Sequence, residues 1–254
     1  MSSRAGDLRA FVSQKDYTLA LVDVVVNNLA SVCMATQGFN MPRREPPAPA
    51  RAIPYGLPED ADPELGFHMP RPDTGALDDQ PTQDGEPAFE AALTGGQLEA
   101  VPVELQSGDV IELYRVGGCI EAARVQAFGG QDAYLDGIST LLRLQDLSFL
   151  AERQAVASPE QATLDRDWAA CVGELGFTFA NPLDAWAATW PNPVGADERL
   201  AAATDVGCKR QVDYTARADS IRREYDGQVL ESNAGLLEQW TSFEQQVAIA
   251  VAGR

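Results

Sequence analysis

The four cysteines of this 254-residue chain stand in two repeated local contexts. Cys33 and Cys171 each begin the pattern Cys-x-x-x-x-Gly-Phe, whereas Cys119 and Cys208 each directly follow a glycine. The first context predicts a cysteine close to the C-terminal end of a helix, and the second predicts one at or near the start of a helix. Each half of the chain carries one cysteine of each kind, so the pattern favours one cross-link in each half.

The glycine of the first context is the physical reason to expect a helix end there. Glycine takes the left-handed conformation just past a helix without the steric cost that other residues incur. The phenylalanine after it can then contact the residue five positions earlier, as in a Schellman motif. The two expected contacts join Phe39 to Met34 and Phe177 to Val172. Because Gly-Phe pairs after helices are common, internal duplication and two independent helix ends both stay open.

The repeated contexts favour the disulfides Cys33–Cys119 and Cys171–Cys208 among the three pairings that four cysteines allow. No Cys-x-x-Cys pair is present and His68 is the only histidine, so a zinc site would need all four thiolates from distant segments. We therefore expect no metal site and no cofactor. Bridges of such long span stabilise a fold by roughly 4 to 5 kcal/mol each in the chain-entropy model, and they persist in oxidising compartments. Buried free thiols in a cytosolic protein are the alternative.

The chain is strongly acidic, with a formal net charge of −19 and a pI of about 4.3. This field would repel phosphate groups, so we expect no nucleic-acid partner. Lys15 and Lys209 are the only lysines, while arginine supplies the other basic charges and alanine is abundant. Such a bias is typical of a high-GC actinobacterial genome.

Membrane spans and export signals are not expected in this sequence. The most apolar stretch, Leu19–Val26, is short and carries Asp23, whereas a spanning helix needs roughly 20 apolar residues. We therefore expect no transmembrane segment. The residues after Met1 lack the apolar core of a signal peptide, so any export signal is expected to have been removed. Residues 1–12 are expected to form a flexible stalk.

We expect a mainly α fold for residues 13–254: a single disulfide-linked helical domain with a small β-hairpin and a long Pro-rich irregular segment. The first helix is predicted from a cap at Ser13 to Gly38, because apolar residues recur at helical spacing between them. Residues 41–100 form the irregular segment, since eleven of the 16 prolines lie between Pro42 and Pro87.

The irregular segment is also acidic. Ten carboxylates and a single arginine, Arg71, lie between Glu59 and Glu90. No EF-hand pattern is present, so a solvated loop is favoured over a weak calcium site. Five apolar side chains are expected to pin parts of the loop to the helical body: Ile53, Tyr55, Leu57, Leu65 and Phe67.

The second half of the chain begins with a hairpin and continues as helices. Apolar and polar residues alternate over Val101–Leu105 and Val110–Tyr114 around a Gln-Ser-Gly-Asp turn, which predicts a β-hairpin over residues 101–114. Residues 119–252 are predicted to be helical, with one start marked by the capping box Ser158-Pro159-Glu160-Gln161. The expected helices are Cys119 to Phe128, Tyr134 to Leu150, a helix after Ser158, a short one from Asn181, Asp197 to Cys208, and one long helix to Ala252.

Five parts of the chain stand out together: Val32–Phe39, Tyr55–Phe67, Gly118–Arg124, Trp168–Cys171 with Gly176-Phe177, and Ala203–Cys208 with the terminal helix. Together they resemble a family of uncharacterised four-cysteine secreted proteins and lipoproteins from Streptomyces and related actinobacteria. The likeness covers most of the chain from about Asp16 onward. It implies a secreted or lipid-anchored protein that partners exported peptidoglycan-binding proteins and ABC export systems, and it carries no catalytic residue across.

Common catalytic motifs are missing from the sequence. There is no Gly-x-Ser-x-Gly elbow, P-loop, Gly-x-Gly-x-x-Gly or His-Glu-x-x-His. His68 is expected to be an exposed loop residue, not a general base. Asp165 and Asp167 are two positions apart and do not share a helix face, so they make a poor catalytic pair. We therefore expect a protein that is not an enzyme.

The favoured function is a secreted or cell-surface accessory protein that binds an unknown ligand, and a cell-envelope protein or glycan is the partner that we expect. The long loop and the segment with Trp186 and Trp190 are candidate contact surfaces, although tryptophans at this spacing more often fill a core. A cell-wall hydrolase with paired carboxylates is one alternative. A helical spacer that self-associates through its terminal helix is another, and the oligomeric state is open. The expected location is extracellular or on the outer face of the cytoplasmic membrane.

Overall fold

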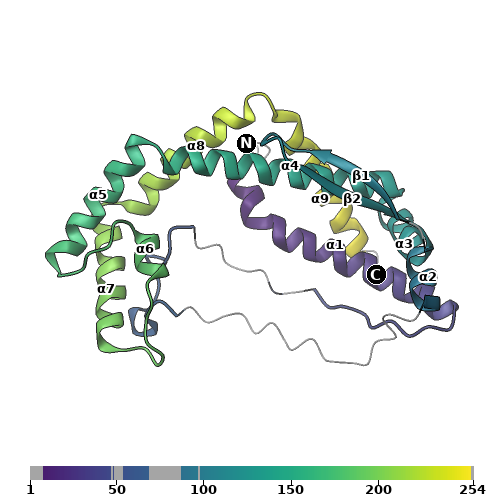
Figure 1. Ribbon diagram of the computed structural model, residues 1–254, viewed down its shortest axis with the longest axis horizontal. Coiled ribbons are helices and arrows are strands. Elements are labelled where there is room, and N and C mark those ends of the chain that lie inside the picture. The colour runs from purple at the N-terminus through teal and green to yellow at the C-terminus, as the bar shows by residue number, and fades with distance from the viewer. Residues whose placement is uncertain (1–7, 47, 49–53, 69–86, 97, 253–254) are drawn as a thin grey trace. The chain divides into compact units, whose positions relative to one another are not determined.

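The computed structural model describes residues 8–46, 48, 54–68, 87–96 and 98–252. The fold is mainly α-helical with one two-stranded antiparallel hairpin and two disulfides, which confirms the predicted fold class (Figure 1). The elements in chain order are α1 Leu8–Thr36, η1 Pro63–Leu65, α2 Pro87–Thr94, β1 Leu98–Glu104, β2 Val110–Val116, α3 Gly118–Phe128, α4 Gln131–Val156, α5 Pro159–Glu174, α6 Pro182–Ala187, α7 Ala196–Gln211, α8 Tyr214–Leu230 and α9 Ala234–Ala252.

The chain divides into two compact units, and both α4 and α8 contribute residues to each. Unit 1 comprises residues 1–50, 73–150 and 229–254, and unit 2 comprises residues 51–72 and 151–228. Each unit has its own apolar core and its own disulfide. The single domain over residues 13–254 stays a prediction.

The first helix begins earlier than the sequence indicated. Leu8 and Phe11 already lie in α1, and they are only 1% and 3% exposed. Phe11 packs edge-on against Trp240 of α9, with ring centroids 5.3 Å apart. The expectation of a polar stalk over residues 1–12 is therefore wrong for residues 8–12, and the cap at Ser13 is wrong because the helix continues through it. Residues 1–7 lie outside the described part of the chain.

Both predicted helix ends after the Cys-x-x-x-x-Gly-Phe pattern are confirmed. Gly38 and Gly176 have φ values of +86° and +92°, in the left-handed region. The amide of Phe39 donates to the Met34 carbonyl at 3.0 Å, and that of Phe177 donates to the Val172 carbonyl at 3.1 Å. These are the long hydrogen bonds of two Schellman motifs.

The segment Gln14–Thr36 of α1 is long and apolar enough to cross a membrane, with a mean hydropathy of 1.7. The sequence argument missed it because it considered only the shorter run Leu19–Val26. A buried core helix has the same composition, and Val22, Val25, Ala30 and Met34 of α1 are fully buried in unit 1. The lack of a transmembrane segment stays a prediction.

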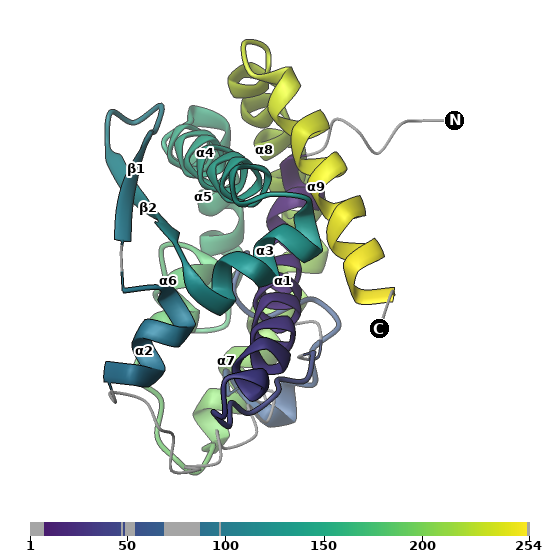
Figure 2. The same cartoon turned by 90° about the vertical axis from the view of Figure 1, so that its right-hand side faces the viewer.

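The Cys33–Cys119 disulfide joins the last turn of α1 to the first turn of α3, as predicted, with the Cα atoms 5.5 Å apart. Figure 2 shows α1 and α3 side by side. Gly118, with φ +62°, allows the start of α3 to lie close to α2, because an added Cβ would lie 2.4 Å from the Ala92 carbonyl oxygen. The bridge therefore sits in a corner where three helices meet.

The larger core of unit 1 lies between α1, α4 and α9. Leu141 and Leu144 of α4 are buried there with Trp240, Phe243 and Val247 of α9. Position 137 of α4 requires glycine, because an added Cβ would lie 2.2 Å from the Phe243 ring. The apolar face of α9 is thus packed against the core of unit 1.

The Cys171–Cys208 disulfide of unit 2 joins α5 to α7, with Cα atoms 5.7 Å apart. The pairing is confirmed, but Cys208 lies in the last turn of α7, so its predicted place at the start of a helix is wrong. Gly207 before it is an interior helix residue with open space around it. The two bridges therefore share only the context of their first cysteines.

Two other expectations about helices are wrong. Residues 87–94, assigned to the irregular segment, form α2, which starts with Pro87 and buries Phe89. The long terminal helix is two helices, because the chain turns at residues 231–233, where the Asn233 side chain donates to the Val229 carbonyl. The Asn233 carbonyl in turn accepts the Leu236 amide at the start of α9.

The predicted packing of apolar side chains of the irregular segment on the helical body is partly confirmed. Leu57 and Phe67 are buried in the core of unit 2, and Tyr55 packs against it. Leu65 is 46% exposed, so its predicted role is wrong. Ile53, Arg71 and most of the acidic stretch lie outside the described residues.

Each disulfide should stabilise the helices of its own unit against local unfolding. We expect the Cys33→Ala/Cys119→Ala variant to lose amide protection in α1 and α3 while α5 and α7 keep theirs, because each core closes within one unit. Native-state hydrogen exchange measures this, and the Cys171→Ala/Cys208→Ala variant is the matched control with the opposite pattern. Equal loss across both units in each variant would instead show a single cooperative domain.

Candidate functional site

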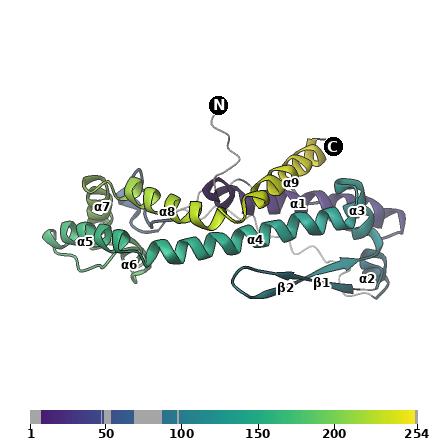
Figure 3. The same cartoon turned by 90° about the horizontal axis from the view of Figure 1, so that it is seen from above.

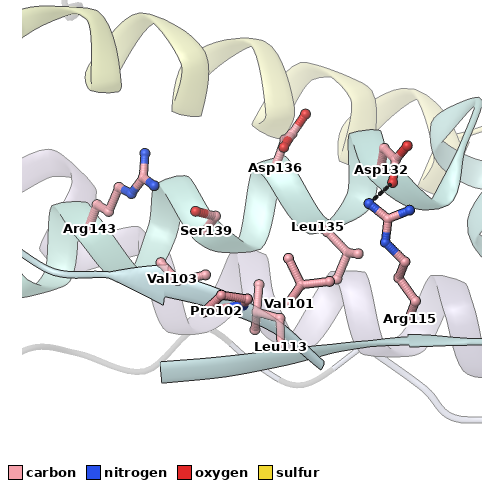
Figure 4. A pocket seen from close by; sticks show the side chains of 10 residues that line it. All are labelled: Val101, Pro102, Val103, Leu113, Arg115, Asp132, Leu135, Asp136, Ser139 and Arg143. Carbon is pink, nitrogen blue, oxygen red and sulfur yellow. Dashed lines mark ion pairs between the residues drawn. The ribbon is translucent and has the colours of Figure 1, made fainter. Parts of the chain in front are cut away.

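A groove lies between the β-hairpin and α4 in unit 1. Figure 3 shows the hairpin running alongside α4. The volume of the groove is about 380 Å³, within the range of small-ligand pockets. The hairpin supplies one wall and α4 the other, as Figure 4 shows. The lining residues are Val101, Pro102, Val103, Leu113, Arg115, Asp132, Leu135, Asp136, Ser139 and Arg143.

The register of the hairpin makes the strand wall largely apolar. Val101 lies opposite Leu113, and Val103 lies opposite Ile111. Directly opposed residues of antiparallel strands share a face, and alternate residues along a strand share it too. The alternation that predicted the hairpin therefore places an apolar face toward α4. The strands extend beyond the predicted 101–114, to Leu98 and Val116.

The helix wall is a polar stripe. Asp132, Asp136, Ser139 and Arg143 follow one another at spacings of four, three and four residues, so they lie along one face of α4. Figure 4 shows Ser139 between Asp136 and Arg143. An apolar wall thus faces a stripe with two carboxylates, a hydroxyl and a guanidinium.

Polar contacts tie the hairpin to α4 at both ends of the groove. At the turn, the Ser107 amide donates to the Asp146 carboxylate at 2.9 Å. At the base, the Val116 amide donates to Gln131 at 2.8 Å, and Arg115 pairs with Asp132 at 2.7 Å. The Arg115–Asp132 pair is well exposed, so it positions the end of the groove more than it stabilises the fold.

Arg124 of α3 reinforces the hairpin base. Its guanidinium donates to the Tyr114 carbonyl and to the Gln131 side chain, both at 3.0 Å. It also lies over the Tyr134 ring, 4.1 Å from the centroid. The base of the hairpin is therefore fixed by α3 and α4 together.

A second cavity of about 340 Å³ adjoins the groove and shares Arg143 with it. Within the described chain, neither Asp136 nor Arg143 forms an ion pair, whereas Arg115 and Asp132 neutralise each other. The unpaired charges of the groove are thus one of each sign. The second cavity is lined by Glu104, Leu105, Gln106, Arg143, Leu147, Asn233 and Leu236.

Unit 2 contains a different polar cluster, the buried pair Lys209–Asp205 on α7. Lys209 is 1% exposed and donates to Asp205 at 2.8 Å and to the Leu57 carbonyl at 2.7 Å. Arg210 beside it donates to the Glu59 carbonyl. These bonds attach residues 54–68 to α7, and the pair has no access to solvent, so we assign it a structural role.

Burial dominates the electrostatics of this pair. It raises the pKa of Asp205 to about 6, although the neighbouring Lys209 and Trp168 act to lower it. Burial likewise lowers the pKa of Lys209, against the opposing effect of Asp205. The charged form of each group is thus disfavoured by its surroundings and retained through its partner.

His68 occupies an exposed position, as expected, but it has a buried partner. Its Nε2 lies 3.3 Å from Glu198 Oε1, and its side chain is 45% exposed, whereas Glu198 is fully buried. Glu198 also accepts the Phe67 amide at 2.9 Å. Gly66 makes this approach possible, since an added Cβ would lie 2.3 Å from Glu198 Oε1. These contacts hold the end of the pinned segment on α7.

The other residues singled out from the sequence have structural partners. Asp165 accepts the Tyr214 hydroxyl at 2.6 Å, and Asp167 pairs with Arg217 at 2.9 Å. Trp186 and Trp190 pack on the core of unit 2, where the Trp190 ring stacks on Phe67 with centroids 5.1 Å apart. The tryptophans are therefore core residues more than a contact surface. Among the described residues, no group of three His, Cys, Asp or Glu side chains could hold a metal ion.

Sequence reasoning missed the groove and the Lys209–Asp205 pair. The helical spacing of Asp132, Asp136, Ser139 and Arg143 was visible in the sequence, but only the fold shows that this stripe faces the hairpin. Lys209 carried a weak signal, as one of two lysines in an arginine-rich chain.

Comparison with known proteins adds no further assignment, because no family model, curated protein or solved structure matches this chain. The groove and the buried pair must therefore be interpreted from their own chemistry.

The Lys209→Met variant should lose about 3 to 5 kcal/mol of unfolding free energy, because it leaves Asp205 buried without a charge partner. The Asp205→Leu/Lys209→Met double variant should recover much of the loss. Urea unfolding measures both. Lys15→Met is the matched control, since Lys15 pairs with the exposed Asp16 and its loss should cost less than about 1 kcal/mol. A Lys209→Met variant as stable as Lys15→Met would contradict the structural role.

The Asp205 carboxyl should also make stability depend on pH. Its pKa is about 6 in the folded chain and about 3.9 when unfolded, so the folded state binds the proton more tightly. The stability that it contributes is complete below about pH 4 and is lost as the pH rises through about 6. We expect wild type to lose up to about 3 kcal/mol relative to Asp205→Asn between pH 4 and pH 7, measured by urea unfolding. A relative gain over that interval would contradict the assignment.

Proposed function

We propose that the protein is a secreted or cell-surface accessory protein that binds a ligand in the groove between the hairpin and α4, without catalysis. The observation that carries this proposal is the groove itself: an apolar wall faces a polar stripe, and both ends are tied by hydrogen bonds and an ion pair. A preformed cavity that combines apolar surface with placed polar groups is typical of a ligand site.

The disulfides indicate an oxidising environment, where such bonds form and persist. Export to the cell surface accounts for this environment. Membership of the actinobacterial secreted family, a lipid anchor and a cell-envelope protein or glycan as partner belong to the same proposal and rest on the sequence resemblance.

The hydrolase alternative finds little support in the groove. Asp132 and Asp136 are one helical turn apart, close to the separation of a glycosidase pair. However, Arg115 binds Asp132, and both aspartates are exposed, whereas a general acid needs a desolvated carboxyl. We therefore favour binding over hydrolysis.

The spacer alternative depended on one long terminal helix. The chain turns at residues 231–233, and the apolar face of α9 is buried through Leu237, Trp240 and Phe243. Little of that face is left for self-association, so the spacer is the weaker proposal.

Filling the groove should abolish binding. We expect immobilised wild type to retain a component of an envelope extract that the Ser139→Trp and Pro102→Trp variants retain at least tenfold less, because each adds bulk from a different wall. Thr189→Trp, an exposed change in unit 2, is the control. Quantitative mass spectrometry of the eluates measures retention, and the retained component should stay chemically unchanged on prolonged incubation. Equal retention by all four proteins would overturn the proposed site, and turnover of the component would overturn the proposed lack of catalysis.

A further inference from the structure

The unpaired charges of the groove are spaced for a ligand that carries two opposite charges of its own. Asp136 and Arg143 are seven residues apart on α4, and helical rise places their Cα atoms about 10.5 Å apart along its axis. Neither forms an ion pair within the part of the chain that the structure describes. A ligand with only an anionic group would use Arg143 and meet the uncompensated Asp136 carboxylate.

The spacing matches a short peptide with free termini. Extended residues span about 3.3 to 3.6 Å each, so three residues place an ammonium and a carboxylate about 10 Å apart. A longer peptide would have to bend or carry one terminus past its partner.

The rest of the groove suits the body of such a peptide. Val101, Val103 and Leu113 offer apolar surface to its side chains, and the Ser139 hydroxyl lies between the two charges, where it can bond a peptide amide or carbonyl. The Arg115–Asp132 pair lies beyond Asp136 and neutralises itself, so it does not compete for either terminus.

We propose that the groove binds a short apolar peptide of about three residues, with its free ammonium at Asp136 and its free carboxylate at Arg143. This inference rests on the proposed function, because it names the ligand class of the same site. The carboxylate would be held by the guanidinium fork, which matches its geometry.

The test compares three probes, Leu-Val-Leu, its N-acetyl derivative and its C-terminal amide, by NMR titration of the full disulfide-bonded chain. Wild type should bind the free peptide about fivefold more tightly than either derivative, since exposed charge pairs contribute modestly. Asp136→Asn should lose only the preference for the free ammonium, and Arg143→Gln only the preference for the free carboxylate. Arg153→Gln, an exposed change on α4 that lines neither cavity, should keep both preferences.

The results distinguish an error in the ligand class from an error in the proposed function. If the three probes bind wild type equally, or not at all, while Ser139→Trp still loses the envelope component, the peptide class is wrong and the groove remains a binding site. If decanoate binds more tightly than the peptide and depends on Arg143 but not on Asp136, the ligand is an anionic amphiphile and the proposal is overturned. If Ser139→Trp retains the component as wild type does, the proposed function itself fails.

Discussion

The disulfide between a glycine-capped helix end and a later helix is the constraint on which each unit depends. In unit 1 the chain leaves α1 through Gly38, and Cys33 in the last turn holds α3 beside it. In unit 2 the chain leaves α5 through Gly176, and Cys171 holds α7. Glycine is needed at both positions because the residue just past each helix is left-handed. A local backbone requirement thus fixes a long-range contact in both units.

The groove follows from the bridge of unit 1. Cys119 stands three residues after the last strand residue, so the bridge that anchors α3 also anchors the base of the hairpin. From α3, Arg124 binds the Tyr114 carbonyl and Gln131, which in turn binds the Val116 amide. The hairpin alone would be a marginal structure, since two strands rarely suffice for stability in water. Its wall of the groove is held by α3, by Gln131 and by the contact of the turn with Asp146.

The sequence predicted what short-range chemistry decides. The helix ends at Gly38 and Gly176, the hairpin and the side-chain cap at Ser158 each depend on neighbouring residues. The predicted cysteine pairing is correct, although only the context of Cys33 and Cys171 is shared by the two bridges. Predictions from the sequence were wrong where tertiary packing or turn chemistry determines the structure. The apolar spacing of the terminal helix runs through residues 231–233, and only the Asn233 contacts end it. Cys208 follows a glycine inside a helix, so the same dipeptide that opens α3 means nothing in α7. The groove and the Lys209–Asp205 pair could not be predicted because their partners are distant in sequence.

Peptide mass mapping of the unreduced protein tests the central claim most directly. The account predicts two linked species, one joining the peptides of Cys33 and Cys119 and one joining those of Cys171 and Cys208, with no alkylatable thiol. Free thiols at these positions, or a link between the cysteines of different units, would contradict it.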